Sequence, residues 1–458
     1  MHHHDEGTVL APSRAEVFWF WLKLGFISFG GPAGQIAIMH RELVDEKRWI
    51  SEARFLHALN YCMLLPGPEA QQLATYLGWL MHRTLGGIVA GLLFVLPSLL
   101  LLIGLSWVYV VYGQLPAVAG LLYGIKPAVA ALVLQAVHRV GSRTLKKPAQ
   151  APVLWAVAVL SFIAIAGFQV AFPWVVLTAA LVGWLGQRLV PAQFAVAGGH
   201  GSAKPAAQHR GAWLDDHTPT PPHARYRPAR LAAVLLVGSA LWLLPVGALL
   251  LWQGWQGPLT QMAWFFTKAA LLTFGGAYAV LPYVYQGAVQ QFGWLTGPQM
   301  MDGLALGETT PGPLIMVVTF VGFLGGWHKA MLGPEALLLS AVLAALVVTW
   351  FTFLPSFIFI LAGGPLVEST HGRLQFTAPL TAITAAVVGV IASLAILFIA
   401  HIAYPTGPGA GFLLNLDIAA LALTALAALA LMRLKWGVMP VMAGCALMGL
   451  AVRLLGLA

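Results

Sequence analysis

Two Pro-Gly-Pro triplets are the residues of this sequence whose types and spacing point most directly to chemistry. Pro66-Gly67-Pro68 follows one apolar helical segment, and Pro311-Gly312-Pro313 follows another. Proline removes a backbone donor and glycine permits unusual dihedral angles, so a helix cannot run straight through either triplet. Inside a bilayer, non-helical backbone must be buried in protein or line a wet cavity. Paired breaks of this kind are typical of a transporter's binding site.

Two Phe-Gly-Gly motifs lie upstream of the triplets and predict two further helix starts. The first is Phe29-Gly30-Gly31-Pro32, and the second is Phe274-Gly275-Gly276-Ala277. A helix start offers unpaired N–H groups and a partial positive charge, and glycine lets a ligand approach the backbone closely. We therefore expect four helix starts to converge on a tetrahedral oxyanion. The alternative is that these glycines and prolines only permit tight helix packing.

Polar side chains beside the breaks extend the predicted anion site. A carboxylate opposes a dianion unless it is protonated or paired, so Glu69 and Glu308 are candidate proton carriers. The alternatives are that each partners Arg83 or Lys126, or stabilises a helix N-terminus. Amides and hydroxyls donate hydrogen bonds without adding charge. The candidates of that kind are Gln71, Gln72, Thr309 and Thr310.

Three lysines in apolar segments are candidate cations for the same site, because charge inside a membrane is costly and usually functional. Lys126 lies well inside one apolar segment. Lys23 and Lys268 occupy equivalent positions, each four residues after a tryptophan, so snorkelling to the membrane interface is their alternative role. Asp302 and His57 also occupy equivalent positions and are weaker candidates.

These motifs belong to a sequence duplication. Residues 19–68 align with 264–313 at a constant shift of 245 positions, without a gap. The alignment superposes both Phe-Gly-Gly motifs and both Pro-Gly-Pro triplets. Further along the chain, Leu96-Pro97-Ser98 resembles Leu354-Pro355-Ser356. Each half is therefore expected to build the same set of broken helices.

The distribution of basic residues predicts that the two copies have opposite orientations in the membrane. The charged loop 41–54 contains four Lys or Arg residues, whereas its counterpart 286–299 contains none. The basic loop 139–147 likewise has an apolar counterpart near 391–399. By the positive-inside rule, the loops of the first copy are cytoplasmic and those of the second are not. We therefore predict an inverted-topology internal repeat with broken or re-entrant helices.

Composition indicates an all-α polytopic membrane protein. Of the 458 residues, 59% are hydrophobic and 9% are charged, with a mean hydropathy of +0.83. The predicted spans are 86–110, 116–138, 231–252, 336–361, 374–401, 412–432 and 437–455, together with 150–167 and 170–189, which form a tight helical hairpin.

The predicted domain organisation is an N-terminal repeat (1–190), a linker (191–229) and a C-terminal repeat (230–458). The linker is rich in Pro, Ala, Gly and His, and we interpret it as flexible and cytoplasmic. The net charge of +9 is explained by basic cytoplasmic loops, so nucleic-acid binding is not predicted. The sequence contains no P-loop, HExxH or nucleophile elbow, so we expect neither an enzyme, nor a cofactor, nor a metal site.

The sequence resembles the chromate ion transporter family in its long, two-domain form. The resemblance rests on Phe29 to Gln35, on Lys47-Arg48-Trp49-Ile50, on Leu65 to Gln72 and on the matching second-half motifs. It implies a secondary carrier in the bacterial inner membrane that exports chromate and confers chromate resistance. The motif residues that the resemblance assigns to the site are Gly30, Gly31, Pro32, Gln35, Pro66, Gly67, Pro68, Gln71, Gly275, Gly276, Pro311, Gly312 and Pro313.

Several alternatives remain open at the level of the sequence. Chromate is isosteric with sulfate, so a carrier of sulfate or another oxyanion is one alternative, and a passive anion channel is another. Ala277 stands where the first motif has proline, so we expect the two anion-facing ends to be unequal. The expected partners are the anion and the lipid bilayer. The oligomeric state is open, with a homodimer as one arrangement.

Overall fold

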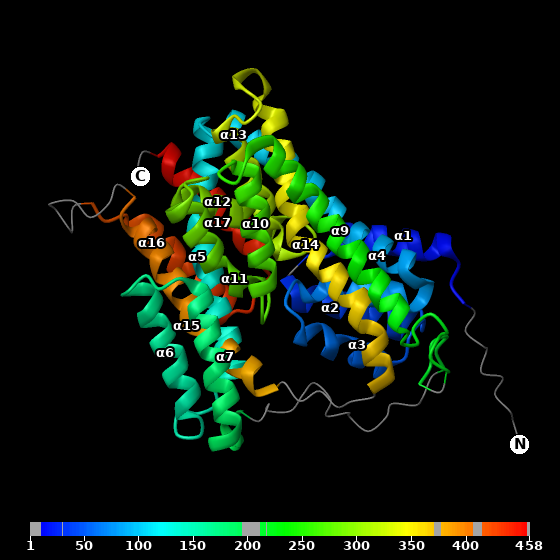
Figure 1. Cartoon of the computed structure of the whole chain (residues 1–458). Helices are drawn as coiled ribbons and strands as arrows, with labels where there is room; N and C mark the ends of the chain where they lie inside the picture. The colour runs from blue at the N-terminus through cyan, green and yellow to red at the C-terminus, as the bar shows by residue number, and fades with distance from the viewer. Residues whose placement is uncertain are drawn as a thin grey trace, which may run out of the picture.

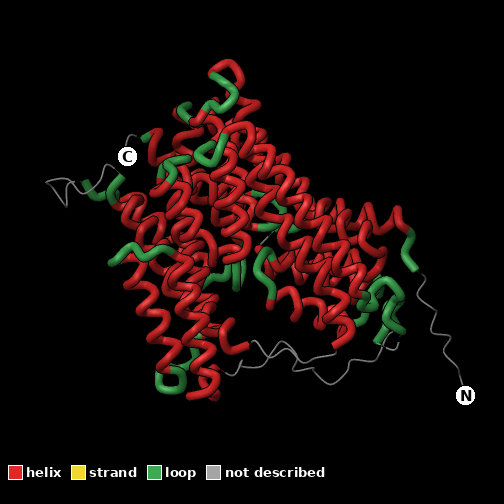
Figure 2. Tube along the Cα trace, viewed as in Figure 1, coloured by secondary structure: helices red, strands yellow, loops and turns green. Residues whose placement is uncertain are grey.

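The computed structural model of the chain describes residues 11–29, 31–194, 211–216, 218–370, 377–405 and 415–455. Within these ranges every regular element is a helix, apart from an isolated β-bridge between Ile50 and Leu214. Figure 2 shows helices throughout the molecule, joined by short connections. The predicted all-α fold is confirmed.

The first half contains the broken helices that the Gly and Pro motifs predict. Ser13 and Ser51 are the N-caps of α1 and α3, and both side chains accept a hydrogen bond from a backbone N–H in the first turn. Its elements are α1 (Arg14–Ile27), α2 (Gly31–His40), the π-helix η1 (Arg41–Glu46), α3 (Glu52–Leu64), α4 (Glu69–Tyr112), α5 (Pro116–Thr144), α6 (Pro152–Ala166), α7 (Phe172–Leu189) and α8 (Pro191–Phe194).

The second half repeats this order after the added helix α9. Its elements are α9 (Pro228–Gln253), α10 (Pro258–Leu272), α11 (Ala277–Tyr285), the π-helix η2 (Gln286–Gln291), α12 (Gly297–Thr309), the 3-10 helix η3 (Leu314–Met316), α13 (Val317–Lys329), the 3-10 helix η4 (Pro334–Ala336), α14 (Leu337–Thr370), α15 (Thr377–Ala403), α16 (Ile418–Met432) and α17 (Val438–Leu454).

The duplication extends to individual residues of the backbone. The π-helices η1 and η2 begin and end at positions separated by the same 245-residue shift, as do α3 and α12. Gly31 and Gly276 both have positive φ, at 71° and 98°. The same sequence signals therefore produce the same local structure in both halves.

Five helical stretches are long and apolar enough to cross a membrane, so the chain is a multi-pass membrane protein. They are α4, α5, α9, η4 with α14, and α15, and they cover five of the nine predicted spans. The other four predicted spans form the shorter helices α6, α7, α16 and α17. The α4 helix is bent at His82 and Arg83, which have non-helical dihedral angles. The predicted hairpin 150–189 forms as α6 and α7. At 15 residues, however, α6 extends about 22 Å, less than the roughly 30 Å of a hydrocarbon core.

The two halves share one interleaved core. The first-half helix α5 packs on α16 and α17, and the second-half helix α15 packs on α6 and α7. Glycines allow the close approach: Gly124 of α5 lies against Gly449 of α17, and Gly389 of α15 lies against Ala158 of α6. Equivalent helices are thus exchanged between the halves: Figure 1 shows α15 beside α6 and α7, and α5 beside α17.

Equivalent connections lie at opposite ends of the molecule. In Figure 1, the part of α4 that follows the bend at His82 and Arg83 rises to the end of the molecule drawn at the top, where α5 begins. Its counterpart α14 starts at that end and descends to the opposite one, where α15 begins. The corresponding helices α4 and α14 therefore run in opposite directions.

The basic segments differ from the predicted loops. Residues 41–46 continue α2 as a π-helix, and α3 starts at Glu52, so the charged segment is largely helical. The α5 helix runs to Thr144, so Arg139 and Arg143 lie on a helix and not in a loop. Charged residues did not mark the helix ends because Lys and Arg are themselves good helix formers.

Residues 211–216 and 218–227, within the predicted linker, pack on the first half. The backbone of Leu214 pairs with that of Trp49 and Ser51, at N···O distances of 3.1 and 3.0 Å. His223 Nε2 lies 3.0 Å from the carbonyl oxygen of Trp79, just before the bend of α4. Both Leu214 and Ala224 are buried. This packing was not expected from the composition of the segment; residues 195–210 lie outside the described part.

Candidate functional site

Four helix starts line a small cavity between the two halves. Its walls are Pro32 and Gln35 from α2, residues 68–70 at the start of α4, Ala277 at the start of α11, and residues 313–315 at η3. The cavity volume is about 10 Å³, which is room for about one water molecule. The four starts therefore meet as the sequence predicts, in a form too narrow for a tetrahedral oxyanion.

The backbone at these starts carries donors that the helices do not use. In α4 the first helical bond runs from Gln72 N to Pro68 O, at 3.0 Å. In α11 it runs from Ala279 N to Gly276 O, at 3.0 Å, and at η3 from Met316 N to Pro313 O, at 2.9 Å. The N–H groups before each first bond have no acceptor within their own helix. Together with the positive ends of the helix dipoles, they make the cavity suitable for an anion.

Each Pro-Gly-Pro triplet is docked on the Phe-Gly-Gly motif of the other half. Gly67 N donates to Thr273 O at 2.8 Å, and Gly312 N donates to Ser28 O at 2.8 Å. Ser28 and Thr273 are equivalent residues, each immediately before a Phe-Gly-Gly motif. The exchange is reciprocal, so the triplets fasten the two halves to each other at the cavity.

Glycine is required at the centre of both triplets. Gly67 has a φ of 127° and Gly312 has a φ of 105°, in the region that favours glycine. A Cβ atom on Gly67 would lie 2.5 Å from Ser356 Oγ, and one on Gly312 would lie 2.7 Å from Ser98 Cβ. These serines end the two Leu-Pro-Ser motifs. Each triplet is therefore also packed against the Leu-Pro-Ser motif of the other half.

Gln35 supports the cavity wall through its amide nitrogen. Nε2 donates to Ser28 O at 3.2 Å and to Gly312 O at 2.5 Å. Both partners are carbonyl oxygens, which fixes the orientation of the amide. The Oε1 atom is buried and has no hydrogen-bond partner in the described part of the chain. Gln35 thus uses its donors to join the halves, and its remaining group is an acceptor, which does not suit an anion.

The other predicted amides and hydroxyls surround the breaks but do not line the cavity. Each of these side chains donates a hydrogen bond to a group that lies within six residues of it in the sequence. The contacts are Gln71 Nε2 to Thr75 Oγ1 at 3.0 Å, Gln72 Nε2 to Pro66 O at 2.7 Å, Thr309 Oγ1 to Leu306 O at 3.0 Å and Thr310 Oγ1 to Gly307 O at 3.1 Å. These side chains hold the shape of the breaks. Gly30, by contrast, lies outside the described residues.

The two predicted proton carriers have different surroundings. Glu69 lies on the cavity wall, where it is the single charged side chain among the residues that line the cavity. Glu308 accepts a hydrogen bond from the Tyr278 hydroxyl, and the Arg139 guanidinium lies over the Tyr278 ring, 5.5 Å from its centroid. Sequence reasoning missed Arg139 because it was assigned to a basic loop. The absence of Gly and Pro between Pro127 and Gly141 could have placed it on α5.

None of the three predicted lysines lines the cavity. Lys23 pairs with Glu42, at an Nζ–Oε1 distance of 3.3 Å. Lys268 lies over the Trp264 ring, 5.8 Å from its centroid, in agreement with the snorkelling alternative. Lys126 forms an ion pair with Asp302, at an Nζ–Oδ2 distance of 3.6 Å.

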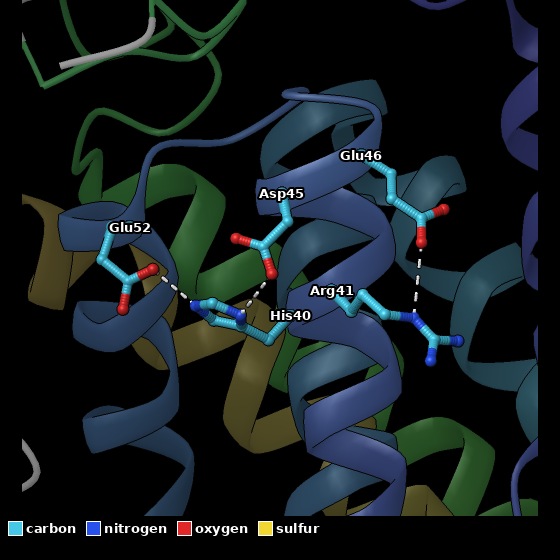
Figure 3. A network of polar contacts seen from close by, with 5 residues as sticks. All are labelled: His40, Arg41, Asp45, Glu46 and Glu52. Carbon is cyan, nitrogen blue, oxygen red and sulfur yellow. Dashed lines mark hydrogen bonds and ion pairs between the residues drawn. The ribbon is translucent and has the colours of Figure 1, made fainter. Parts of the chain in front are cut away.

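The charged segment of the first half is held together by its own ion pairs. Figure 3 shows His40 between Asp45 and Glu52, and Arg41 beside Glu46. His40 Nδ1 lies 3.5 Å from Asp45 Oδ2, and Arg41 Nε lies 3.4 Å from Glu46 Oε1. These contacts join the end of α2 to η1 and to the start of α3.

Comparisons with known proteins identify relatives of the chain. The family model for "Chromate transporter" matches residues 15–184 and 260–450. A chromate transport protein of Pseudomonas aeruginosa is 36% identical over 82% of this chain and 79% of its own length. A chromate transport protein of Cupriavidus metallidurans is 28% identical over 82% of this chain and 80% of its own length. An uncharacterized transporter of Methanocaldococcus jannaschii is 24% identical over 82% of this chain and 82% of its own length. No solved structure is significantly similar to the chain.

Proposed function

Because the chain belongs to the chromate transporter family, we propose that it is a secondary carrier that exports chromate and confers chromate resistance. The observation that carries the proposal is the family match, which covers both halves and leaves out the predicted linker. The 36% identical relative from Pseudomonas aeruginosa is a chromate transport protein and aligns over most of both chains. We place the carrier in the bacterial inner membrane, on the same resemblance.

The proposed substrate site is the cavity at the four helix starts. Its backbone donors and helix dipoles favour a dianion, and no Lys or Arg is among the residues that line it. A cavity of about 10 Å³ corresponds to a closed state, so chromate enters only when the helix starts separate. The reciprocal bonds of Gly67 and Gly312 would then have to loosen.

The proposed architecture is an inverted-topology repeat that gives alternating access. Two observations support it: α4 and α14 run in opposite directions, and basic residues are concentrated in one copy of each duplicated segment. In such carriers, one repeat rocks against the other around a site near the midplane. The interface between the halves, where the triplets dock, is the surface that would move.

Proton coupling is proposed to involve Glu69 and Glu308. A carboxylate on the cavity wall repels a dianion, so Glu69 must be neutralised when chromate binds. The double variant Glu69→Gln with Glu308→Gln is expected to transport chromate with a weaker response to a pH gradient. Unchanged pH-driven flux in proteoliposomes of this variant would exclude both residues.

Chromate uptake into everted membrane vesicles tests the proposed function. Vesicles that contain the protein should take up chromate faster than vesicles without it, with saturation, and a pH gradient should increase accumulation. Competition by sulfate at equal or lower concentrations would favour the sulfate carrier instead. Uptake that rises linearly with chromate concentration and shows no exchange would favour the channel.

A further inference from the structure

A buried ion pair joins the two halves outside the central cavity. Lys126 of α5 lies 3.6 Å from Oδ2 of Asp302 on α12, and Tyr109 of α4 donates a hydrogen bond to the same oxygen at 2.9 Å. The α4 and α5 helices belong to the first half, and α12 belongs to the second. The Asp302 side chain is 4% exposed, and Oδ1 has no hydrogen-bond partner in the part of the chain that is described.

The position of this pair makes it costly to disturb. Lys126 lies well inside α5, one of the helices that is long and apolar enough to cross a membrane. A charge in that setting is expensive unless it is paired, so removing either partner leaves the other charge uncompensated. The Nζ–Oδ2 distance exceeds that of a normal hydrogen bond, so charge attraction holds the pair.

The surroundings of Asp302 contain no other charged partner among the described residues. Of the elements that pack on α12, α4 contributes Tyr109 and α5 contributes Lys126, while η3 carries no titratable group. The other titratable groups on α12, α13, α15 and α17 form no hydrogen bond or ion pair with Asp302; they are Glu308, His328, Lys329, His401, Cys445 and Arg453.

We propose that Asp302 is a proton-binding site that couples protonation to the separation of the two halves, an inference that rests on the proposed carrier function. While Lys126 is in contact, the Asp302 carboxylate stays ionised. When α5 and α12 separate, the carboxylate loses its counter-charge in an apolar setting and binds one proton from water at Oδ1. When the pair forms again, the proton returns to water. One proton is thus bound and released in each transport cycle.

The ion pair between Lys126 and Asp302 occurs in one copy of the duplication. The residue equivalent to Asp302 in the first half is His57, which lies at the same position of α3. The pair therefore breaks the symmetry of the repeat at an otherwise duplicated contact. This gives a matched control, because His57→Gln alters the equivalent position without touching the pair.

The test compares two assays on purified protein in proteoliposomes: exchange of labelled for unlabelled chromate, and accumulation of chromate driven by an imposed pH gradient. For Asp302→Asn we expect exchange within about threefold of the unsubstituted protein and gradient-driven accumulation at least tenfold lower. The pH dependence of its exchange should also flatten. His57→Gln should behave like the unsubstituted protein in both assays.

The outcomes separate this inference from the proposed function. If the unsubstituted protein neither exchanges nor accumulates chromate, the proposed function fails. If Asp302→Asn accumulates chromate normally, the coupling role is wrong while the carrier function stands. If Asp302→Asn loses both activities, the double variant Lys126→Gln with Asp302→Asn decides, because it leaves no unpaired charge. Recovery of exchange without accumulation supports the proposal; recovery of both, or of neither, overturns it.

Discussion

The two halves of this protein share their backbone breaks and differ in their charges. Both have a π-helix after the second helix, a Phe-Gly-Gly turn and a Pro-Gly-Pro triplet with a positive-φ glycine. In the first half, Gln35, Glu42 and Glu69 add polar chemistry around these breaks; their counterparts are Val280, Gly287 and Leu314. The comparison teaches that the duplicated part builds the cavity. The residues present in one copy, among them Gln35 and Glu69, add an amide and a carboxyl group to its wall.

The same contrast is visible at the surface. The charged segment 40–54 carries ion pairs and contacts residues 211–216 and 218–227, whereas its counterpart has no Lys, Arg, Asp or Glu between Gln286 and Gln299. The conformational strain of the backbone also differs between the two segments. Arg48 has a φ of 52°, and the equivalent residue is Gly293, with a φ of 57°. A non-glycine residue in this conformation is strained by roughly 1 kcal/mol. The first half therefore has a charged residue, Arg48, at a strained backbone position where the second half has glycine.

The largest expected effect comes from the shared feature, the triplet glycines. Gly67→Ala and Gly312→Ala should each lower the stability of the protein by about 2 kcal/mol, because a Cβ atom clashes and the backbone conformation favours glycine. Chromate flux should fall at least tenfold in both variants. Thermal unfolding in detergent and flux in proteoliposomes measure the two effects.

Gly104→Ala is the matched control for these variants, because a Cβ atom at Gly104 meets no atom within 4 Å. It should leave flux and unfolding temperature unchanged. If only one of the two triplet glycines is sensitive, the halves do not contribute equally to the cavity, and the comparison must be revised.

A smaller effect is expected at the equivalent lysines. Lys23→Gln removes the partner of the nearly buried Glu42 and should cost about 1 kcal/mol, since Lys23 itself is largely exposed. Lys268→Gln leaves no carboxylate unpaired and should change stability by less than about 0.5 kcal/mol. Unfolding temperatures of the two variants measure the difference.

The double variant Lys23→Gln with Glu42→Gln should recover most of the stability that Lys23→Gln loses. Equal losses at Lys23 and Lys268 would show that the Lys23–Glu42 pair does not distinguish the halves.

The smallest expected effect concerns the contact of His223 with the first half. Burial lowers the pKa of His223, so the folded protein favours its neutral form. This contribution to stability is present above the ordinary histidine pKa of about 6.5 and is lost as pH falls through the lowered value. The difference in unfolding temperature between the unsubstituted protein and His223→Gln should therefore shrink as pH falls from about 7.5 to 5. A difference that stays constant with pH contradicts this role.

Much of the fold follows from local signals that a sequence displays. The break positions and five of the nine predicted spans depend on Pro, Gly and apolar periodicity within a few residues, and the structure has them where they were predicted. The π-helix pair was not predicted, because the first of these segments was assigned to a charged loop. The partners of Gly67, Gln35 and Lys126 could not be derived in this way. They depend on which helices of opposite halves meet, and no local pattern encodes that exchange.

The central claim is that the four helix starts bind a tetrahedral dianion that the protein carries across the membrane. The most direct measurement is exchange of labelled chromate in proteoliposomes of the purified protein, with Gly67→Ala and Gly104→Ala side by side. We predict that exchange is saturable and that unlabelled chromate on the far side accelerates it. The Gly67→Ala variant should lose this exchange, and the Gly104→Ala variant should keep it. Linear chromate flux without acceleration, or equal exchange in both variants, would contradict the account.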